Sequence, residues 1–263
     1  MIRMFAVAAV VLAAGICSCG GRERVENEVV EVEQTVTESV DTLLDKETKR
    51  VDGRDYLIFR PRREKCYVAM VDSVIPELGD SSVLLCVAGA FTGELLDKFK
   101  STNIAGDYVI AGRRRRGYRC RVNTGVLYSD TTGKAVIAPV GESGQWYDRA
   151  VENKGWLVQQ MQLLRGGKDV YSGYPVKRTS SNIYRAACVL DDGAFAIIQG
   201  EQRQPFGSFI AALQTLGVSD ALYLDMGTGW NYGWYRLSPQ TPPQRLFTIR
   251  NPHQTNWITI KAK

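Results

Sequence analysis

The chain has 263 residues, 33 Lys and Arg against 28 Asp and Glu, and a formal net charge of +5. So mild a charge does not argue for nucleic-acid binding. A single histidine, His253, excludes an HExxH zinc site and a multi-histidine metal centre, and no Gly-x-Ser-x-Gly elbow accompanies it. Acid–base chemistry would therefore use carboxylates, tyrosines or cations.

Residues 1–19 have the pattern of an export signal. Arg3 precedes the apolar run Met4 to Ile16, which has the length of a signal-peptide core and is too short to span a bilayer. The following Ile16-Cys17-Ser18-Cys19 resembles a bacterial lipobox, and Cys19 after small Ser18 fits better than Cys17 after bulky Ile16. We expect lipidation at Cys19 and stable anchoring. An ordinary cleaved signal peptide is the alternative, and both place the protein outside the cytoplasm.

Residues 20–54 are predicted to be an acidic stalk. The stretch is rich in Glu, Val and Thr, and its most acidic part, Glu23 to Glu47, has no proline or aromatic residue. Such a composition favours a disordered tether, with a transient amphipathic helix as the alternative. A single folded domain is expected over residues 55–263, facing the periplasm or the cell surface.

Short apolar runs separated by turn residues predict strands over 66–71, 83–88, 108–111, 125–128, 135–139, 185–190 and 194–199. Asp191-Asp192-Gly193 predicts a hairpin between the last two. Helices are predicted over 147–165 and over 206–216, the second ending at Gly217 as a C-cap. The order of elements predicts an α+β fold, with a mixed or antiparallel β-sheet core and flanking helices.

Four cysteines remain after the signal region, namely Cys66, Cys86, Cys120 and Cys188. They allow several disulfide pairings, among which the sequence does not choose. Cys86 lies within the apolar run of residues 83–87, so a buried free thiol fits that position equally well.

The segment Ala221 to Trp230 joins an apolar run to a carboxylate and a glycine turn. Asp225 ends the run, and Gly227, Thr228 and Gly229 follow it. A buried strand in this position delivers an acidic side chain into a turn whose bare backbone approaches a ligand closely. A plain strand end with an Asp-initiated turn is the alternative.

This segment resembles the Leu-Asp-Gly-Gly-Gly-Ser signature of the phosphodiester glycosidase family, whose members hydrolyse a sugar 1-phosphodiester. Residues 87–91 resemble the family's Asn-Ala-Gly-Tyr-Phe element and residues 185–189 its Arg-Thr-Ala-Ile-Gly strand. Residues 192–198 resemble its hairpin return, residues 206–217 its helix, and residues 220–225 the strand that enters the glycine turn. The resemblance extends over most of residues 83–260. The chain departs from the family pattern at ligand-facing positions: Val87, Ala186, Met226, Thr228 and Trp230.

The resemblance implies two central residues. Arg185 would clamp phosphate with its bidentate guanidinium, with a surface ion pair as the alternative. Asp225 would act as general base or nucleophile, or would orient sugar hydroxyls. The remaining expected ligand contacts are Gly89, Gly227, Thr228, Gly229, Trp230 and Asn231.

Two further segments have open alternatives. Alternation places Trp230, Tyr232 and Trp234 on one side of an extended strand, where they would stack on a sugar ring or pack into the core. Core packing is expected for at least two of these rings and is preferred for Trp257. The run Arg113 to Arg116, with Arg119 and Arg121, is predicted to be a solvated loop. Recruitment of a polyanionic glycan or an anionic lipid headgroup is the alternative.

Together these features predict an exported hydrolase that cleaves a glycosyl 1-phosphodiester to a free sugar and a phosphomonoester. A non-catalytic glycan-binding lipoprotein on the same fold is the alternative, favoured by the departures at Val87, Ala186 and Met226. An envelope scaffold factor is a third interpretation. No organic cofactor is implied, and a divalent cation held by carboxylates and backbone oxygens is compatible with the sequence. The expected partners are a carbohydrate or sugar-phosphate substrate and the membrane through the lipid anchor, with no nucleic acid.

Overall fold

The structure is a computed structural model and describes residues 41–72, 74–92, 104–227, 229–252 and 254–263. The predicted signal peptide with Cys19, most of the predicted stalk, Thr228 and His253 lie outside the described residues. In the described ranges no helix is long and apolar enough to cross a membrane.

The expected α+β class is wrong, because the described part of the chain is β-rich. Strands make up 46% of it and helices 11%, so the helices α2 (Gly144–Glu152) and α3 (Phe206–Thr215) are minor elements. Every pairing between named strands is antiparallel. A short 3₁₀ helix covers Val140–Glu142.

The main error concerns residues 147–165, which were predicted to form one helix. Helix α2 ends at Glu152, and Lys154 then adopts a left-handed φ of 51°. Two strands follow at once, β9 (Trp156–Gln160) and β10 (Gln162–Arg165). Strand β9 pairs with β5 on one side and β7 on the other, and this pairing outweighs the mixed polarity that suggested a longer helix.

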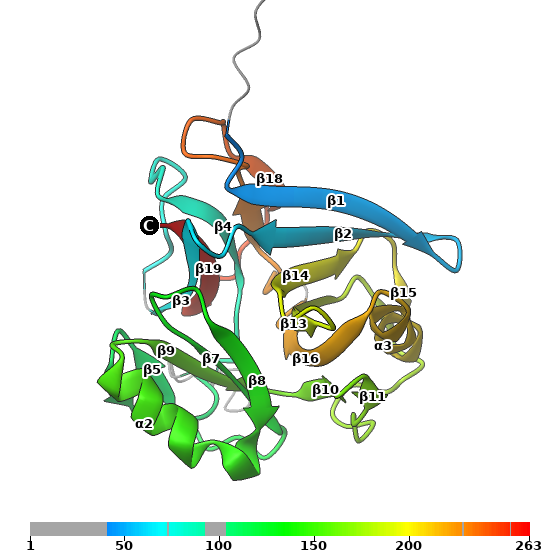
Figure 1. The fold of residues 1–263 in the computed structure, drawn as a ribbon. Helices are drawn as coiled ribbons and strands as arrows, with labels where there is room; N and C mark the ends of the chain where they lie inside the picture. Colours follow the sequence, from blue (N-terminus) through cyan, green and yellow to red (C-terminus); the bar gives the residue numbers. More distant parts are fainter. Residues whose placement is uncertain (1–40, 73, 93–103, 228, 253) are drawn as a thin grey trace, which may run out of the picture. The chain divides into compact units, whose positions relative to one another are not determined.

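The largest sheet has seven strands and contains the predicted hairpin around Asp191-Asp192-Gly193, which joins β13 to β14. Figure 1 shows its long β1–β2 hairpin in blue at one edge. In spatial order the strands are β1 (Leu44–Val51), β2 (Arg54–Pro61), β14 (Phe195–Gly200), β13 (Arg185–Leu190), β16 (Val218–Leu224), β10 and β11 (Lys168–Asp169).

Strand β1 lies inside the range predicted as stalk. Leu44 and Val51 are buried at its two ends, and the strand pairs with β2 along its whole length. The ordered sheet therefore begins at Leu44 and not near residue 55. The sequence did not indicate this strand, because the six residues between Leu44 and Val51 are exposed and all but Thr48 are charged.

Two five-stranded sheets and one two-stranded sheet complete the fold. The first five-stranded sheet contains, in order, β18 (Gln244–Phe247), β17 (Gly233–Tyr235), β4 (Val83–Ala88), β19 (Asn256–Ala262) and β3 (Cys66–Asp72). The second contains β6 (Arg113–Arg115), β5 (Tyr108–Ile110), β9, β7 (Gly125–Ser129) and β8 (Ala135–Pro139). Strands β12 (Ser181–Asn182) and β15 (Gln204–Pro205) form the small sheet.

The predicted strands over 66–71, 83–88, 108–111, 125–128, 135–139, 185–190 and 194–199 are confirmed within a residue or two at their ends. One further prediction fails, since Arg113–Arg115 form strand β6 and not a loop, although their side chains are exposed as expected. The cysteines Cys66, Cys86, Cys120 and Cys188 are free thiols.

Helix α3 confirms the predicted apolar helix and supports the largest sheet. Phe206, Phe209 and Leu213 are fully buried in one cluster with Tyr184 and residues of β16. Gly217 follows with a φ of 74°, a left-handed conformation that ends helices and favours glycine. Figure 1 shows α3 beside the sheet, close to the end of β16. The helix thereby holds the strand that leads to Asp225.

Candidate active site

Strand β16 delivers Asp225 to the end of the largest sheet, as the sequence predicts. Its apolar residues are buried up to Leu224, which lies opposite Arg185 in β13. The backbone N–H of Asp225 donates to the carbonyl of Gly89 at 2.8 Å. Its carboxylate Oδ1 accepts the N–H of Gly227 at 3.0 Å. These contacts fix the carboxyl group in an Asx-type turn at the strand end.

The Asp225 carboxyl is buried, with 4% of the residue exposed. Burial raises its pKa from 3.8 to about 7, and the N–H groups of Gly227 and Met226 and the charge of Arg185 oppose this rise. A carboxyl group with a pKa near neutrality exchanges protons readily at physiological pH. Such a group suits general acid–base chemistry.

Asp225 lines a cavity of about 380 Å³. The described part of its lining combines aromatic rings, small polar side chains, one carboxylate and one cation. Its residues are Phe91, Pro175, Val176, Ser180, Ser181, Asn182, Tyr184, Arg203, Tyr223, Asp225, Gly227 and Trp230. This mixture of apolar walls and a few polar groups is typical of small-molecule sites.

Arg203 is the cation of this cavity, and the sequence analysis did not identify it. Its Nη2 donates to the carbonyl of Ser181 at 2.6 Å, and its Nη1 lies 3.5 Å from Oδ1 of Asn182. Asn182 in turn donates to the carbonyl of Met226, next to Asp225, at 2.9 Å. A chain of polar contacts therefore connects the Arg203 guanidinium to the turn that holds the carboxylate.

Arg185 is fully buried and does not line the cavity. Its Nε and Nη2 donate to Oε1 of Gln199 at 2.8 and 2.5 Å, while Nη1 has no hydrogen-bond partner. Burial lowers the pKa of its guanidinium to about 9, so the group stays charged at neutral pH. The alternative, a surface ion pair, is not found, since no carboxylate oxygen of the described residues lies within 4.0 Å of its guanidinium. From this position Arg185 affects Asp225 through its charge.

Some of the other predicted ligand contacts line the cavity, and the rest belong to the surrounding framework. Gly227 and Trp230 line the cavity. Gly89 belongs to the framework, because a Cβ there would lie 2.4 Å from Oδ1 of Asn256. Gly229 accepts the backbone N–H of Asn251, and Asn231 presents its carbonyl to Arg185 at 3.5 Å. Neither Gly229 nor Asn231 lines the cavity, and Thr228 lies outside the described residues.

The aromatic segment serves mainly the core. Tyr232, Trp234 and Trp257 are buried in one cluster with Val83 and Cys86. The expectation that at least two of the three rings of the segment pack in the core is therefore confirmed. Trp230 is the ring that reaches the cavity.

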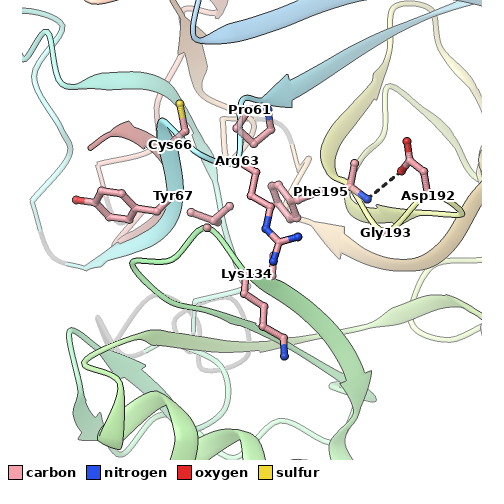
Figure 2. A pocket seen from close by; sticks show the side chains of 12 residues that line it. Pro61, Arg63, Cys66, Tyr67, Lys134, Asp192, Gly193 and Phe195 are labelled. Carbon is pink, nitrogen blue, oxygen red and sulfur yellow. Dashed lines mark hydrogen bonds between the residues drawn. The ribbon is translucent and has the colours of Figure 1, made fainter.

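A second cavity, of about 340 Å³, lies between the Pro61–Cys66 connection and two hairpin turns. Figure 2 shows Arg63 and Lys134 from two of its walls and Asp192 from the third. Asp192 is exposed, and its Oδ1 caps the backbone N–H of Ala194 at 2.9 Å. The described lining of this cavity contains no buried carboxyl group, and its buried titratable group is the Cys66 thiol, whose pKa burial raises, so we place the candidate active site at Asp225.

A divalent-cation site is not evident in the part of the chain that the structure describes. Those residues contain no group of three or more His, Cys, Asp and Glu side chains arranged to hold a metal ion. Of the described residues that line the cavity, Asp225 is the only carboxylate.

Neither a protein-family model nor a curated protein matches this sequence. Among solved structures, the chain is similar to the zebrafish N-acetylglucosamine-1-phosphodiester alpha-N-acetylglucosaminidase catalytic domain auto-inhibited by its pro-peptide. The TM-score is 0.56 at 12% identity, over 86% of this chain and 85% of that one. A hypothetical protein from Synechocystis gives a TM-score of 0.48 at 11% identity, over 84% of this chain and 62% of that one. The first likeness shows a distant relationship of fold with a glycosidase catalytic domain.

Proposed function

We propose that this protein is a hydrolase that cleaves a glycosyl 1-phosphodiester in the Asp225 cavity and releases a free sugar and a phosphomonoester. One observation carries the proposal: a buried carboxyl group, with a pKa of about 7, shares a cavity with a guanidinium. The fold likeness to a glycosidase catalytic domain is consistent with it. We further propose that the protein is an exported bacterial lipoprotein, anchored through Cys19.

Asp225 is the proposed general base. A base whose pKa lies near the working pH is ionised in a large fraction of the molecules and still has enough affinity to accept a proton. In the proposed step a water oxygen attacks C1 of the sugar, and the water proton passes to the Asp225 carboxylate. The bond between C1 and the phosphate oxygen breaks, and its electron pair leaves with the phosphate.

Among the described residues, Asp225 is the one carboxylate of the cavity lining, and this favours a phosphate leaving group. Enzymes that cleave a bond between two sugars generally need a second carboxylic acid to protonate the departing oxygen. A phosphomonoester has a second pKa of about 6, so it departs as an anion without that proton. What it needs is positive charge, and Arg203 supplies the one cation of the lining that the structure describes.

The walls of the cavity suit the sugar. Phe91 and Trp230 offer apolar ring faces, on which a pyranose ring packs well. Ser181 and Asn182 offer groups that bond sugar hydroxyls. Burial raises the pKa of the Tyr223 hydroxyl well above its ordinary value, so Tyr223 remains a neutral neighbour of Asp225.

The test is hydrolysis of a panel of glycosyl 1-phosphodiesters of both anomers by the purified protein. We expect Asp225→Asn to lower kcat about 100-fold or more, because it removes the base. Arg203→Gln should lower kcat/KM about tenfold to 100-fold, the effect of losing a hydrogen bond to a charged group. Arg165→Gln is the matched control, since Arg165 pairs with Glu142 and does not line the cavity. Full turnover by Asp225→Asn would refute the proposal.

A non-catalytic glycan-binding lipoprotein is the second candidate. The position of Arg185 favours this candidate. Arg185 was the expected phosphate clamp, but it donates to Gln199 and does not line the cavity. If the protein turns over no member of the panel but binds free glycans, and Trp230→Ala abolishes that binding, this candidate replaces the hydrolase.

A further inference from the structure

A row of exposed arginines runs along one edge of the second five-stranded sheet. The row, here called the arginine track, consists of Arg113, Arg114, Arg115, Arg116, Arg119 and Arg121. Strand β6, which carries its first part, stands at the end of the sheet order and pairs only with β5. Among the described residues, only Arg114 has an acidic partner, Asp107 at 3.7 Å. The track therefore concentrates positive charge, and apart from Arg114 its arginines have no acidic partner within 4.0 Å among the described residues.

The first part of the track is a strand of the sheet, which distinguishes it from the predicted loop. Arg114 lies opposite Val109 in the register with β5, and its guanidinium lies 4.5 Å from the centre of the Tyr147 ring. Side chains alternate along a strand, so Arg113 and Arg115 share the opposite face. Their spacing along an extended strand is about 6.6 Å. Such a row of cations matches a ligand that repeats its negative charges along a chain.

The second half of the track leads from β6 to the wall of the Asp225 cavity. Tyr118 forms a bridge with Ala105, whose N–H donates to the carbonyl of Phe91 at 2.7 Å. Phe91 lines the cavity. Cys120 packs against the core cluster that contains Tyr223 and Met226, while the alternate residues Arg119 and Arg121 stay exposed.

From this placement we infer that the arginine track binds a polyanionic glycan and feeds it to the Asp225 cavity. This inference rests on the proposed function and names its substrate class: a polymer whose sugars are joined by phosphodiesters, and not a small soluble phosphodiester. Each repeat of such a polymer carries one negative charge. Contacts with Arg113 and Arg115 would hold neighbouring repeats while another repeat occupies the cavity beside Arg203.

An anionic membrane surface fits the track less well. Segments that lie on membranes combine basic residues with apolar side chains that enter the lipid. Within the described ranges, the large apolar side chains that are most exposed are Val74, Val151, Val170, Tyr174 and Ile249. None of them lies in residues 113–121.

The test compares Arg113→Gln/Arg115→Gln with Lys49→Gln/Arg50→Gln, which removes two exposed charges from β1. The probes are long-chain inorganic polyphosphate, phosphatidylglycerol vesicles, a phosphodiester-linked polysaccharide and a small glycosyl phosphodiester. We expect the track variant to bind polyphosphate about tenfold more weakly. The slope of the logarithm of the binding constant against the logarithm of the salt concentration should become shallower by about 1.4, because two contacts with phosphate are lost. Its KM for the polysaccharide should rise about tenfold with kcat unchanged, and its kinetics on the small phosphodiester should match those of the native protein.

Equal polyphosphate binding by the track variant and the native protein would overturn the inference. An equal loss in the β1 variant, or a loss seen on vesicles alone, would overturn it too. If the native protein turns over the small phosphodiester but the track variant keeps its KM for the polysaccharide, the inference fails and the proposed function stands. If neither substrate is turned over while the track variant still loses polyphosphate affinity, the proposed hydrolysis fails and polyanion binding by the track stands.

Discussion

The buried carboxyl of Asp225 should make the protein less stable as the pH rises, and Asp225→Asn should remove that loss. The folded protein raises the pKa of this group from 3.8 to about 7. One pKa unit corresponds to about 1.4 kcal/mol, so the ionised group costs the folded state about 4 kcal/mol. Asparagine has nearly the same shape, and its side-chain oxygen can still accept the N–H of Gly227.

The sign follows from proton binding. Between about pH 4 and about pH 7 the folded state keeps the proton that the unfolded chain releases, so the free energy of unfolding falls as the pH rises. Below this window both states are protonated, and above it both are ionised. The difference in the free energy of unfolding between Asp225→Asn and the native protein should therefore grow in favour of the variant by about 4 kcal/mol from about pH 4 to about pH 8. For a chain of this size that gain corresponds to about 8–16 °C in Tm.

The assay is urea unfolding of both proteins across this pH range, with Asp148→Asn as the matched control. Asp148 is an exposed residue of helix α2, so the control changes a carboxyl that is not desolvated. The difference between Asp225→Asn and the native protein should widen steadily with pH, while the control stays close to the native protein. A difference that is constant from about pH 4 to about pH 8 would refute the assignment of Asp225 as a buried carboxyl with a raised pKa.

Three further predictions concern the framework, the electrostatics and the anchor. Gly89→Ala should reduce the free energy of unfolding by about 1–3 kcal/mol, because its Cβ would lie 2.4 Å from Oδ1 of Asn256. Gly79→Ala, where a Cβ meets nothing within 4 Å, is its control, and an equal urea midpoint for the two would contradict the contact. Arg185→Met removes a positive charge that lowers the pKa of Asp225, so the rise of kcat/KM with pH should move to higher pH. Arg185→Lys should move it less, and coincident profiles for all three proteins would exclude the electrostatic role. Cys19→Ala should abolish lipid labelling and membrane retention in a bacterial host, which Cys17→Ala should leave intact; labelling that depends on Cys17 would contradict the assignment.

Most of the strands could be predicted because their signals are local. The runs over 83–88 and 135–139 and the hairpin at Asp191-Asp192-Gly193 combine apolar residues with turn chemistry, and the structure reproduces them. Strand β1 could not be predicted, because its exposed residues are charged and only its two ends are buried. Its order comes from pairing with β2, which a local pattern does not reveal.

The fold class was wrong for a related reason. The segment 144–152 is helical, but the strands β9 and β10 that follow belong to two different sheets. Their partners lie far away in the sequence: β9 pairs with β7 and β5, and β10 with β16. Long-range pairing of this kind overrides the local propensity of a mixed sequence.

The site residues that lie in one motif at the end of a strand could be predicted. Those that the fold brings together from separate segments could not. Asp225, Gly227 and Trp230 stand in one short segment, and all three line the cavity. Arg203 lies in a connection without a motif, and the antiparallel pairing of β12 with β15 brings it to the cavity. The predicted hairpin brings Gln199 opposite Arg185, but the sequence does not show that Arg185 is buried or that its guanidinium donates to Gln199.

The most direct test is hydrolysis of a glycosyl 1-phosphodiester in ¹⁸O-labelled water, with the products separated and weighed by mass spectrometry. Attack of water on C1, with Asp225 as the base, predicts that the label enters the sugar, and that Asp225→Asn loses the reaction. Label in the phosphomonoester would place the attack at phosphorus and contradict the proposed mechanism. Equal labelling of the sugar by the native protein and Asp225→Asn would remove Asp225 from the chemistry.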